Sequence, residues 1–544
     1  MKKSLVIVCL LLSAVLTFAQ DSISFPDIER CTKSYLIADA NPKDMAFLKE
    51  KCRQAGLDLG LSVLANRIPT NSKLVTPKPS EHLLKQGILH LQLPIDDSQT
   101  EFAVYYSELF NQPAHINVLQ IDDELVVYRS TERTGNIHLF YGCDRGAYGT
   151  KKTAHDRDAI VYKLWDTPER TLLPDFELQN QMAQTEAKRC AKTDFPLLIF
   201  NDLKSYAYND QGDTAIGHFL DTMHKYNPNK LLQADQLTPI SRHYLSRINE
   251  NQLWNESMRT KIVETLTEKQ DFYLENRMPW MIGNFQIHLA DKKRKATTIE
   301  ELEWFLSKAA AFDAGFGLDF SPDAMRKHGM ADTMLNTINI WETLRLSGAF
   351  SEEQKEAFKD PYGNWHIIKQ NDSIYLLFEQ QISRRYVCEP TIYRCDPKIL
   401  EQDEIYLTEN TVKPKRYNDG TFDSWGFMKG NWNWNCPYNS PLYLMVSVEG
   451  TGSISDLCLI TQWGKLTVNG TVKAGQYLLF DANTKITDIN FNTVETTPSK
   501  EQVRLLEGDN LIGFSCSFVG EKEKIPVVNV RYILRGNAQE IKIP

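Results

Sequence analysis

The sequence has no run of 18 consecutive apolar residues, no CxxC or HExxH motif and no histidine-rich cluster. A transmembrane helix needs about 20 mainly apolar residues, and zinc sites use closely spaced Cys and His ligands. Internal repeats and low-complexity linkers are also absent from the sequence. We therefore expect no transmembrane segment, no metal site and no cofactor.

The N-terminus has the pattern of a secretory signal. Lys2 and Lys3 precede an apolar run over 5–16, and small residues follow near Ala19. The run is too short for a membrane span. We expect a signal peptide over 1–19 and an exported protein, either periplasmic or secreted.

Cysteine usage and charge narrow the class further. The ten cysteines show no disulfide framework, and the closest pair is Cys388 and Cys395. The net charge is −9, which makes nucleic acid and anionic membranes poor partners for this chain. A neutral carbohydrate is the partner that an exported acidic protein fits better.

Strand-like and helix-like segments alternate over two parts of the chain. The first is a strand–helix–strand pattern over 34–64, and the second covers 171–346. Between them, 82–165 contains short alternating β-like runs, and short strands without helices return after about 361. Within the second part, Thr298 and Glu301 match a helix-capping pattern.

This alternation predicts an α/β fold with a parallel sheet, and the number of units favours a (β/α)8 TIM-like barrel. We expect the barrel to carry a β-rich insertion and to be followed by a C-terminal β-sandwich. The expected parts are a signal peptide (1–19), the first βα units (20–81), the insertion (82–165), the rest of the barrel (166–360) and the β-rich region (361–544).

Several carboxylates stand at or just after predicted strand ends. The run LLIF (197–200) reads as a fully buried strand and leads into Asn201 and Asp202. In a barrel, the carboxyl ends of the strands form the active-site rim, and glycoside hydrolysis needs two carboxylates there. We therefore take Asp175, Asp202 and Asp235 as catalytic candidates, although Asp is also a common helix cap and turn residue.

Other polar residues near the same ends are candidates for binding substrate. They are Glu177, Asn201, His243, Arg247, Trp254 and Asp319. An ordinary solvated loop explains those in the stretch 241–254 equally simply. Trp425, Trp432 and Trp434 could stack on sugar rings or fill the core of a sandwich.

The segment YGCDRGAYGTKKTAH (141–155) is rich in glycine. It does not follow a strand and open a helix, as a phosphate-binding loop would. We interpret its glycines as turn residues of a β module. A phosphate cradle and an adhesin-like module remain alternatives.

Residues from about 120 to 360 resemble exported bacterial proteins with a glycoside-hydrolase-like (β/α)8 barrel. The matching stretches are 141–155, LLPDFELQ (172–179), MIGNF with the residues up to 321, and GAFSEEQKEAFKDP (348–361). In such proteins the strand corresponding to LLIFND usually ends in Phe-Asp-Gly-Leu-Glu, and its Asp resembles a catalytic carboxylate.

This chain departs from that pattern at three positions. Asn201 replaces the Asp, Asp202 replaces the Gly and Lys204 replaces the Glu. A shift of one residue along a strand points a side chain to the opposite face. Asp202 can therefore take over the carboxylate role only if the strand end is irregular.

Two hypotheses follow for the function. The first is an exported glycoside hydrolase acting on a poly- or oligosaccharide through carboxylates at the strand ends. The second is a non-catalytic glycan-binding protein on a degenerate glycosidase barrel, which Asn201 and Lys204 favour.

Overall fold

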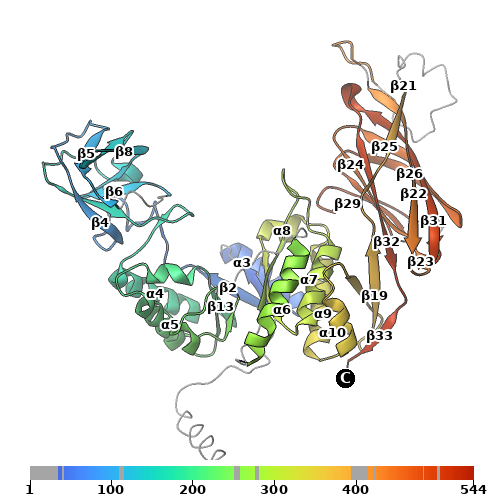
Figure 1. Cartoon of the computed structure of the whole chain (residues 1–544), viewed down its shortest axis with the longest axis horizontal. Coiled ribbons are helices and arrows are strands. Elements are labelled where there is room, and N and C mark those ends of the chain that lie inside the picture. Colours follow the sequence, from blue (N-terminus) through green and yellow to red (C-terminus); the bar gives the residue numbers. More distant parts are fainter. Residues whose placement is uncertain are drawn as a thin grey trace, which may run out of the picture. The chain divides into compact units, whose positions relative to one another are not determined.

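The computed structural model describes residues 35–38, 42–108, 115–249, 258–275, 281–393, 415–421, 423–481, 483–498 and 503–543. These residues form two compact units. Unit 1 contains 60–249, and unit 2 contains 35–59 together with 258–543. Figure 1 shows the elements of both units.

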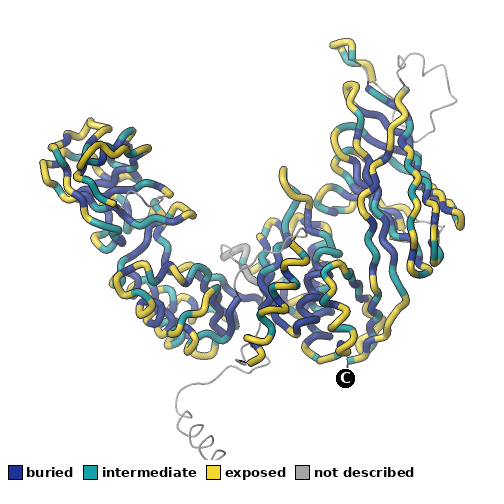
Figure 2. The backbone as a smooth tube through the Cα atoms, in the orientation of Figure 1, coloured by how far each residue is buried: buried dark blue, intermediate teal, exposed yellow. Residues whose placement is uncertain are grey.

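Unit 1 contains parallel strands that end at one common edge. Their order is β15-β14-β13-β2, and each neighbouring pair is parallel. Their bounds are β2 (Leu59–Val63), β13 (Leu197–Phe200), β14 (Leu231–Ala234) and β15 (Arg247–Ile248). The residues of β13 and β14 are all buried, as Figure 2 shows, which confirms the prediction that LLIF is a buried strand.

Two packed helices accompany these strands, α4 (Phe176–Ala191) and α5 (Asp213–Tyr226). Short 3₁₀ helices η3 (Leu203–Ala207) and η4 (Ser241–His243) follow β13 and β14. The loops after the strands therefore carry the candidate polar residues of this unit.

The β-rich segment of unit 1 consists of two antiparallel sheets on one apolar core. The core includes Leu119, Val126, Phe140 and Val161. One sheet has the order β10-β7-β6-β11-β4 and the other β5-β9-β8. The strands are β4 (Lys85–His90), β5 (Phe102–Tyr105), β6 (Val118–Ile121), β7 (Glu124–Val127), β8 (Ser130–Thr134), β9 (Ile137–Tyr141), β10 (Asp144–Arg145) and β11 (Ile160–Leu164). A separate short pair joins β3 (Ile68–Pro69) to β12 (Thr171–Leu172).

Unit 2 begins with parallel strands in the order β1-β17-β16. These strands are β1 (Tyr35–Ala38), β16 (Met281–Ile287) and β17 (Gly315–Phe320). The helices of this part are α3 (Pro42–Gln54), α6 (Arg259–Glu275), α7 (Ile299–Ala311), α8 (Pro322–Lys327), α9 (Ala331–Leu346) and α10 (Glu352–Phe358). Thr298 and Glu301 form the capping box expected at the start of α7.

The rest of unit 2 consists mainly of two antiparallel sheets. One has the order β18-β19-β32-β24-β27-β28-β29, with β20 and β33 pairing at its side, and the other has the order β21-β22-β31-β25-β26. The strands of the first are β18 (Asn364–Lys369), β19 (Ile374–Ile382), β20 (Tyr386–Val387), β24 (Tyr443–Glu449), β27 (Tyr477–Phe480), β28 (Asn483–Thr487), β29 (Thr493–Pro498), β32 (Val527–Arg535) and β33 (Gln539–Lys542). Those of the second are β21 (Glu389–Tyr393), β22 (Ser424–Cys436), β25 (Ser453–Thr461), β26 (Gly464–Lys473) and β31 (Gly508–Gly520).

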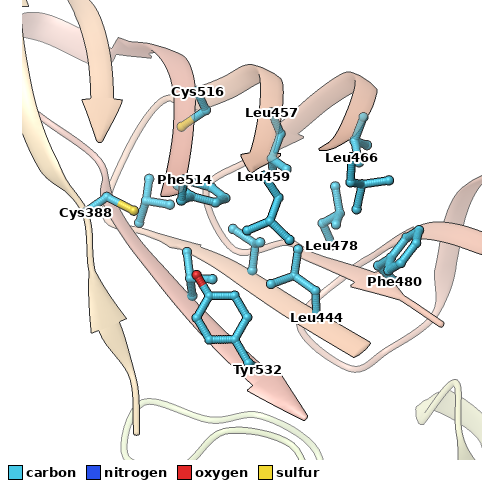
Figure 3. Packing of buried hydrophobic residues seen from close by; sticks show 14 of the residues in the cluster. Cys388, Leu444, Leu457, Leu459, Leu466, Leu478, Phe480, Phe514, Cys516 and Tyr532 are labelled. Carbon is cyan, nitrogen blue, oxygen red and sulfur yellow. The ribbon is translucent and has the colours of Figure 1, made fainter. Parts of the chain in front are cut away.

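The two sheets share one apolar cluster, because alternate residues of each point toward the other. Leu444 from β24 and Tyr532 from β32 pack with Leu459 from β25 and Phe514 from β31, as Figure 3 shows. Trp432 and Trp434 pack against the same cluster. For these two residues, the contacts favour the core interpretation over sugar stacking.

The expected closed barrel is not found. The described residues contain four parallel strands in unit 1 and three in unit 2, and neither set closes on itself. The chain is therefore a mixed α/β protein with extensive antiparallel sheets. Counting apolar runs identified the strands, but ring closure depends on pairings between distant strands that no local pattern encodes.

Candidate active site

The chain bends sharply where β13 ends. Phe200 is the last residue of β13, and Asp202 has φ 61° and ψ 44°, in the left-handed region. Asp and Asn are among the few non-glycine residues that adopt this conformation. The strand end is thus irregular, as the shifted-carboxylate hypothesis requires.

Asp235, one residue beyond β14, holds this bend in place. Its Oδ2 accepts a hydrogen bond from the backbone N–H of Asp202 at 2.7 Å, and its Oδ1 accepts one from that of Leu203 at 3.1 Å. The carboxyl ends of two adjacent parallel strands bring these residues together. Two of the three catalytic candidates are therefore neighbours.

Arg67 completes the cluster, and the sequence reasoning missed it. Its Nη2 contacts Oδ2 of Asp202 and lies 3.4 Å from Oε2 of Glu169. The Arg67 side chain is only 14% exposed, so these contacts are shielded from water more than surface ion pairs are. Arg67 follows β2 by four residues, and this position beyond a strand end was the available signal.

The environment shifts the two carboxyl groups in opposite directions. Burial raises the pKa of Asp202, and the nearby charge of Arg67 offsets this only in part. Burial would also raise the pKa of Glu169, but hydrogen bonds to the backbone and Thr167, with Arg67, outweigh it, so that pKa is lowered. Paired carboxyl groups with divergent pKa values are the pattern of acid–base chemistry.

Neighbouring amides fix the backbone around the cluster. Asn201 donates from Nδ2 to Ser62 Oγ at 3.2 Å, which ties the end of β13 to β2. Asn66 donates to Ser205 Oγ at 3.2 Å, joining the loop of Arg67 to η3. Asn201 therefore supports the site through the backbone elements it links.

The third catalytic candidate lies in a different environment. Asp175 caps α4, because its Oδ1 accepts from the N–H of Leu178 at 2.9 Å. Its Oδ2 lies 2.8 Å from Nδ1 of His82, and this hydrogen bond is the largest cause of the raised pKa of His82. The catalytic role of Asp175 stays a prediction, and its observed contacts are those of a helix cap.

The remaining candidates are dispersed. Glu177 is exposed in the first turn of α4, and His243 is exposed in η4. Arg247 is buried in β15, where its Nε donates to Gln233 Oε1 at 2.8 Å. Asp319 is half-buried in β17 of unit 2, and Trp254 lies outside the described residues.

The glycine-rich segment forms a buried ionic network around Glu124. The side chains of Glu124, Arg145 and His155 are each at most 1% exposed. Glu124 accepts from Nε and Nη2 of Arg145 at 2.7 and 2.9 Å, and from the N–H groups of Gly146 and Thr153 at 2.8 and 3.1 Å.

His155 links this network to a second carboxylate. Its Nε2 lies 2.9 Å from Glu124 Oε2, and its Nδ1 lies 2.9 Å from Asp122 Oδ2. Burial alone would lower the pKa of His155, but both carboxylates raise it. Gly146 and Gly149 have φ of 64° and 83°, as turn residues need. The polar groups contact one another, which favours the turn interpretation over a phosphate cradle.

Metal ligands and membrane helices were also sought. No group of three or more His, Cys, Asp or Glu side chains in the described ranges could hold a metal ion. No helix of the part that the structure describes is long and apolar enough to cross a membrane.

Comparisons with known proteins found only distant similarity. No family model and no curated protein matches the chain. Among solved structures, the glycoside hydrolase domain of PelA from Pseudomonas aeruginosa is 11% identical with a TM-score of 0.27, covering 56% of this chain and 93% of that one.

Two further solved structures are similar at the same level. A debranching enzyme from Nostoc punctiforme is 10% identical with a TM-score of 0.29, covering 64% of this chain and 74% of its own. An Arthrobacter globiformis T6 isomalto-dextranase, complexed with panose, is 9% identical with a TM-score of 0.22, covering 68% and 74%. These neighbours are glycoside hydrolases, and with TM-scores below 0.5 they carry no argument about the chemistry of this chain.

Proposed function

We propose that this protein is an exported glycoside hydrolase that cleaves a poly- or oligosaccharide at the cluster around Asp202. The observation that supports the proposal is the meeting of Asp202, Asp235, Arg67 and Glu169 where the parallel strands of unit 1 end. A glycosidase needs two carboxyl groups, one to protonate the leaving oxygen and one to attack or to activate water.

Asp202 is the proposed general acid. Its raised pKa keeps a proton available for the glycosidic oxygen, and it returns to the carboxylate when that bond breaks. Glu169 is the proposed second carboxylate, because its lowered pKa keeps it ionised for attack at the anomeric carbon.

The contacts also favour a retaining outcome. Asp202 and Glu169 both contact the same nitrogen of Arg67, so their carboxyl groups lie close together. This fits the separation of about 5 Å used by retaining enzymes better than the roughly 6.5–9.5 Å used by inverting ones. Both oxygens of Asp235 already accept backbone N–H groups, so we assign it a positioning role.

The finer organisation of the chain is part of the proposal. We propose a signal peptide over 1–19, a β-rich insertion over 82–165 and a β-sandwich within 361–544. The shared apolar cluster of the two C-terminal sheets supports the sandwich. Among the expected partners, the proposal keeps a carbohydrate and no nucleic acid.

A second candidate function is glycan binding without hydrolysis. It is favoured by the same Arg67 contact, because a cation between two carboxylates stabilises both in the ionised form and opposes proton donation. Asn201 and Lys204, at positions where similar proteins carry acids, also favour it.

Reducing-sugar release by residues 20–544 on a broad glycan panel tests the two candidates. Asp202→Asn keeps the left-handed backbone and removes the acid, so release is expected to fall about 10²–10⁴-fold. Asp210→Asn is the matched control, since Asp210 is an exposed carboxylate eight residues further along the same loop region. Equal activity of both variants would refute the assignment of Asp202.

A pair of variants then separates the candidates. Asp202→Gly removes the carboxylate, and Asn201→Asp with Asp202→Gly restores the pattern of the similar proteins. Under the first candidate, wild type releases sugar and Asp202→Gly does not. Glycan binding without release by wild type, together with release by the double variant, would establish the second.

A further inference from the structure

Unit 2 contains a cleft between the loop after β16 and the first C-terminal sheet. It has a cavity volume of about 400 Å³ and is lined by 291–295 on one side and by 447–450 and 475–477 on the other. An adjoining cavity shares Lys295, Ser447 and Tyr477 with it and adds Arg385 and Arg531. Ligand sites commonly have volumes of about 300–1,000 Å³.

We propose that this cleft binds an acidic oligosaccharide through its carboxylate groups. The site is independent of the carboxylates proposed for hydrolysis, because all of its residues belong to unit 2. It extends the proposed function by giving the chain a second carbohydrate site with its own charge preference.

The loop that forms one wall is held in a defined shape. Asp291 Oδ1 accepts from the N–H groups of Lys293 and Arg294 at 2.7 and 2.8 Å. Lys295 bridges to Glu449 of β24 at 2.6 Å, and the N–H of Ala290 donates to Asn490 Oδ1 at 2.8 Å. The wall is therefore fixed to the sheet on both sides of its basic residues.

An apolar contact beneath the cleft reinforces this arrangement. Ala296 packs with Tyr477 and Phe491, whose rings stack at 5.0 Å with an interplanar angle of 13°. His328 lies against Phe491 and contacts the carbonyl of Thr297 through Nε2 at 2.9 Å. The cleft is a built feature of unit 2, and a ligand would not have to order it.

The cleft carries an excess of positive charge. Its cationic side chains are Lys292, Lys293, Arg294, Lys295, Arg385 and Arg531, and its carboxylates are Asp291, Glu301 and Glu449. Each of the three carboxylates is already engaged, in the loop, in the cap of α7 or with Lys295. The local charge is thus opposite in sign to the net charge of −9.

Three of these cations have no carboxylate partner in the ranges that the structure covers. They are Lys292, Lys293 and Arg385, and all are exposed. Placing like charges together is unfavourable unless an anion compensates them. A carboxylate-bearing ligand would supply the compensation, and guanidinium groups bind carboxylates in a directional, paired geometry.

The polar lining favours a sugar over other anions. Ser447, Gln476 and Asn529 offer both donors and acceptors, which sugar hydroxyls can use in either direction. Nucleic acid fits less well, because the whole chain would repel a long polyanion. The sequence reasoning favoured neutral sugars from the net charge, and the local arrangement changes that expectation.

Calorimetric titration of residues 20–544 with hexagalacturonate and with neutral maltohexaose tests the proposal. Lys292→Glu with Lys293→Glu is expected to weaken hexagalacturonate binding about tenfold or more, since two attractive contacts become repulsive. Lys151→Glu with Lys152→Glu is the matched control, an exposed lysine pair of unit 1 with the same charge change. It should leave the affinity unchanged.

Further arms make the outcome decisive. Arg385→Gln changes one exposed side chain and is expected to weaken binding about threefold, whether or not the double variant folds. Tighter binding of maltohexaose than of hexagalacturonate, or equal weakening by both lysine pairs, would overturn the proposal. Binding of a single-stranded oligonucleotide but not of hexagalacturonate would overturn the ligand class. Hexagalacturonate binding that survives in Asp202→Asn would separate this site from the proposed hydrolysis.

Discussion

Glu124→Gln is the perturbation with the largest effect on stability that the structure predicts. The substitution preserves the shape of the side chain but removes the charge that faces Arg145 and His155. Five donors converge on the two oxygens of Glu124. Whichever way the amide of Gln is turned, its N–H₂ group meets donors and leaves two buried cations without their shared counter-charge.

Two independent arguments give the size of the effect. Removing one partner of a buried ion pair typically costs about 3–5 kcal/mol. Burial alone would raise the pKa of Glu124, but His155, Arg145 and two backbone N–H groups lower it from 4.5 to about 2. That difference corresponds to about 3 kcal/mol. Since the folded-state pKa is the lower one, this stabilisation is present above about pH 4.5 and is lost as the pH falls toward 2.

Amide hydrogen exchange followed by mass spectrometry measures this effect where it occurs, because a chain with two units need not unfold in one step. Peptides from β6, β7 and β11 should exchange at least about 100-fold faster in Glu124→Gln, as about 3 kcal/mol requires. Peptides from β25 and β31 should not change.

The neighbouring residue supplies the control. Asp123 is a carboxylate paired with Lys78 at 3.0 Å, but its side chain is 65% exposed. Asp123→Asn should therefore cost no more than about 1 kcal/mol. If Glu124→Gln and Asp123→Asn exchanged alike, the buried network would not contribute the stability assigned to it.

Two other predictions concern the backbone. Asp235→Asn replaces one acceptor by a donor facing the N–H of Asp202 or Leu203, so sugar release should fall more than glycan affinity does; an equal fall in both would contradict a positioning role. Gly452→Ala should lower the thermal unfolding temperature of the C-terminal sheets, because Gly452 has φ of 95° and an added Cβ would lie 2.1 Å from the carbonyl oxygen of Val519. An unchanged melting curve would contradict this, and Gly464→Ala, with open space around it, is the control.

Local patterns in the sequence were sufficient where one element determines the outcome. The apolar run 197–200 is a buried strand, and Thr298 with Glu301 caps α7. Each feature depends on residues within a few positions of one another. Hydrophobic periodicity and capping chemistry act over that range, so they can be read without knowing the fold.

Features that join distant residues could not be predicted in the same way. Arg67 meets Asp202 across 135 positions, and nothing near Arg67 in the sequence specifies that partner. Glu124 meets Arg145 and His155 across 21 and 31 positions. The sequence drew attention to the glycines of that segment, whereas a carboxylate outside it holds the structure together. Closure of the expected barrel failed for the same reason, since strand pairing is a long-range property.

The conformation of Asp202 explains why the sequence can depart from the pattern of similar proteins without breaking the bend. Those proteins place a Gly where Asp202 stands, and a φ of 61° is a conformation that Gly adopts without strain. Among residues with a carboxylate, Asp tolerates the left-handed region best because its short side chain can bond to nearby backbone, whereas Glu cannot do so as easily. The two N–H groups bound by Asp235 stabilise the same bend. A carboxylate can therefore move from position 201 to 202 only as Asp, and only while Asp235 remains to hold the backbone beneath it.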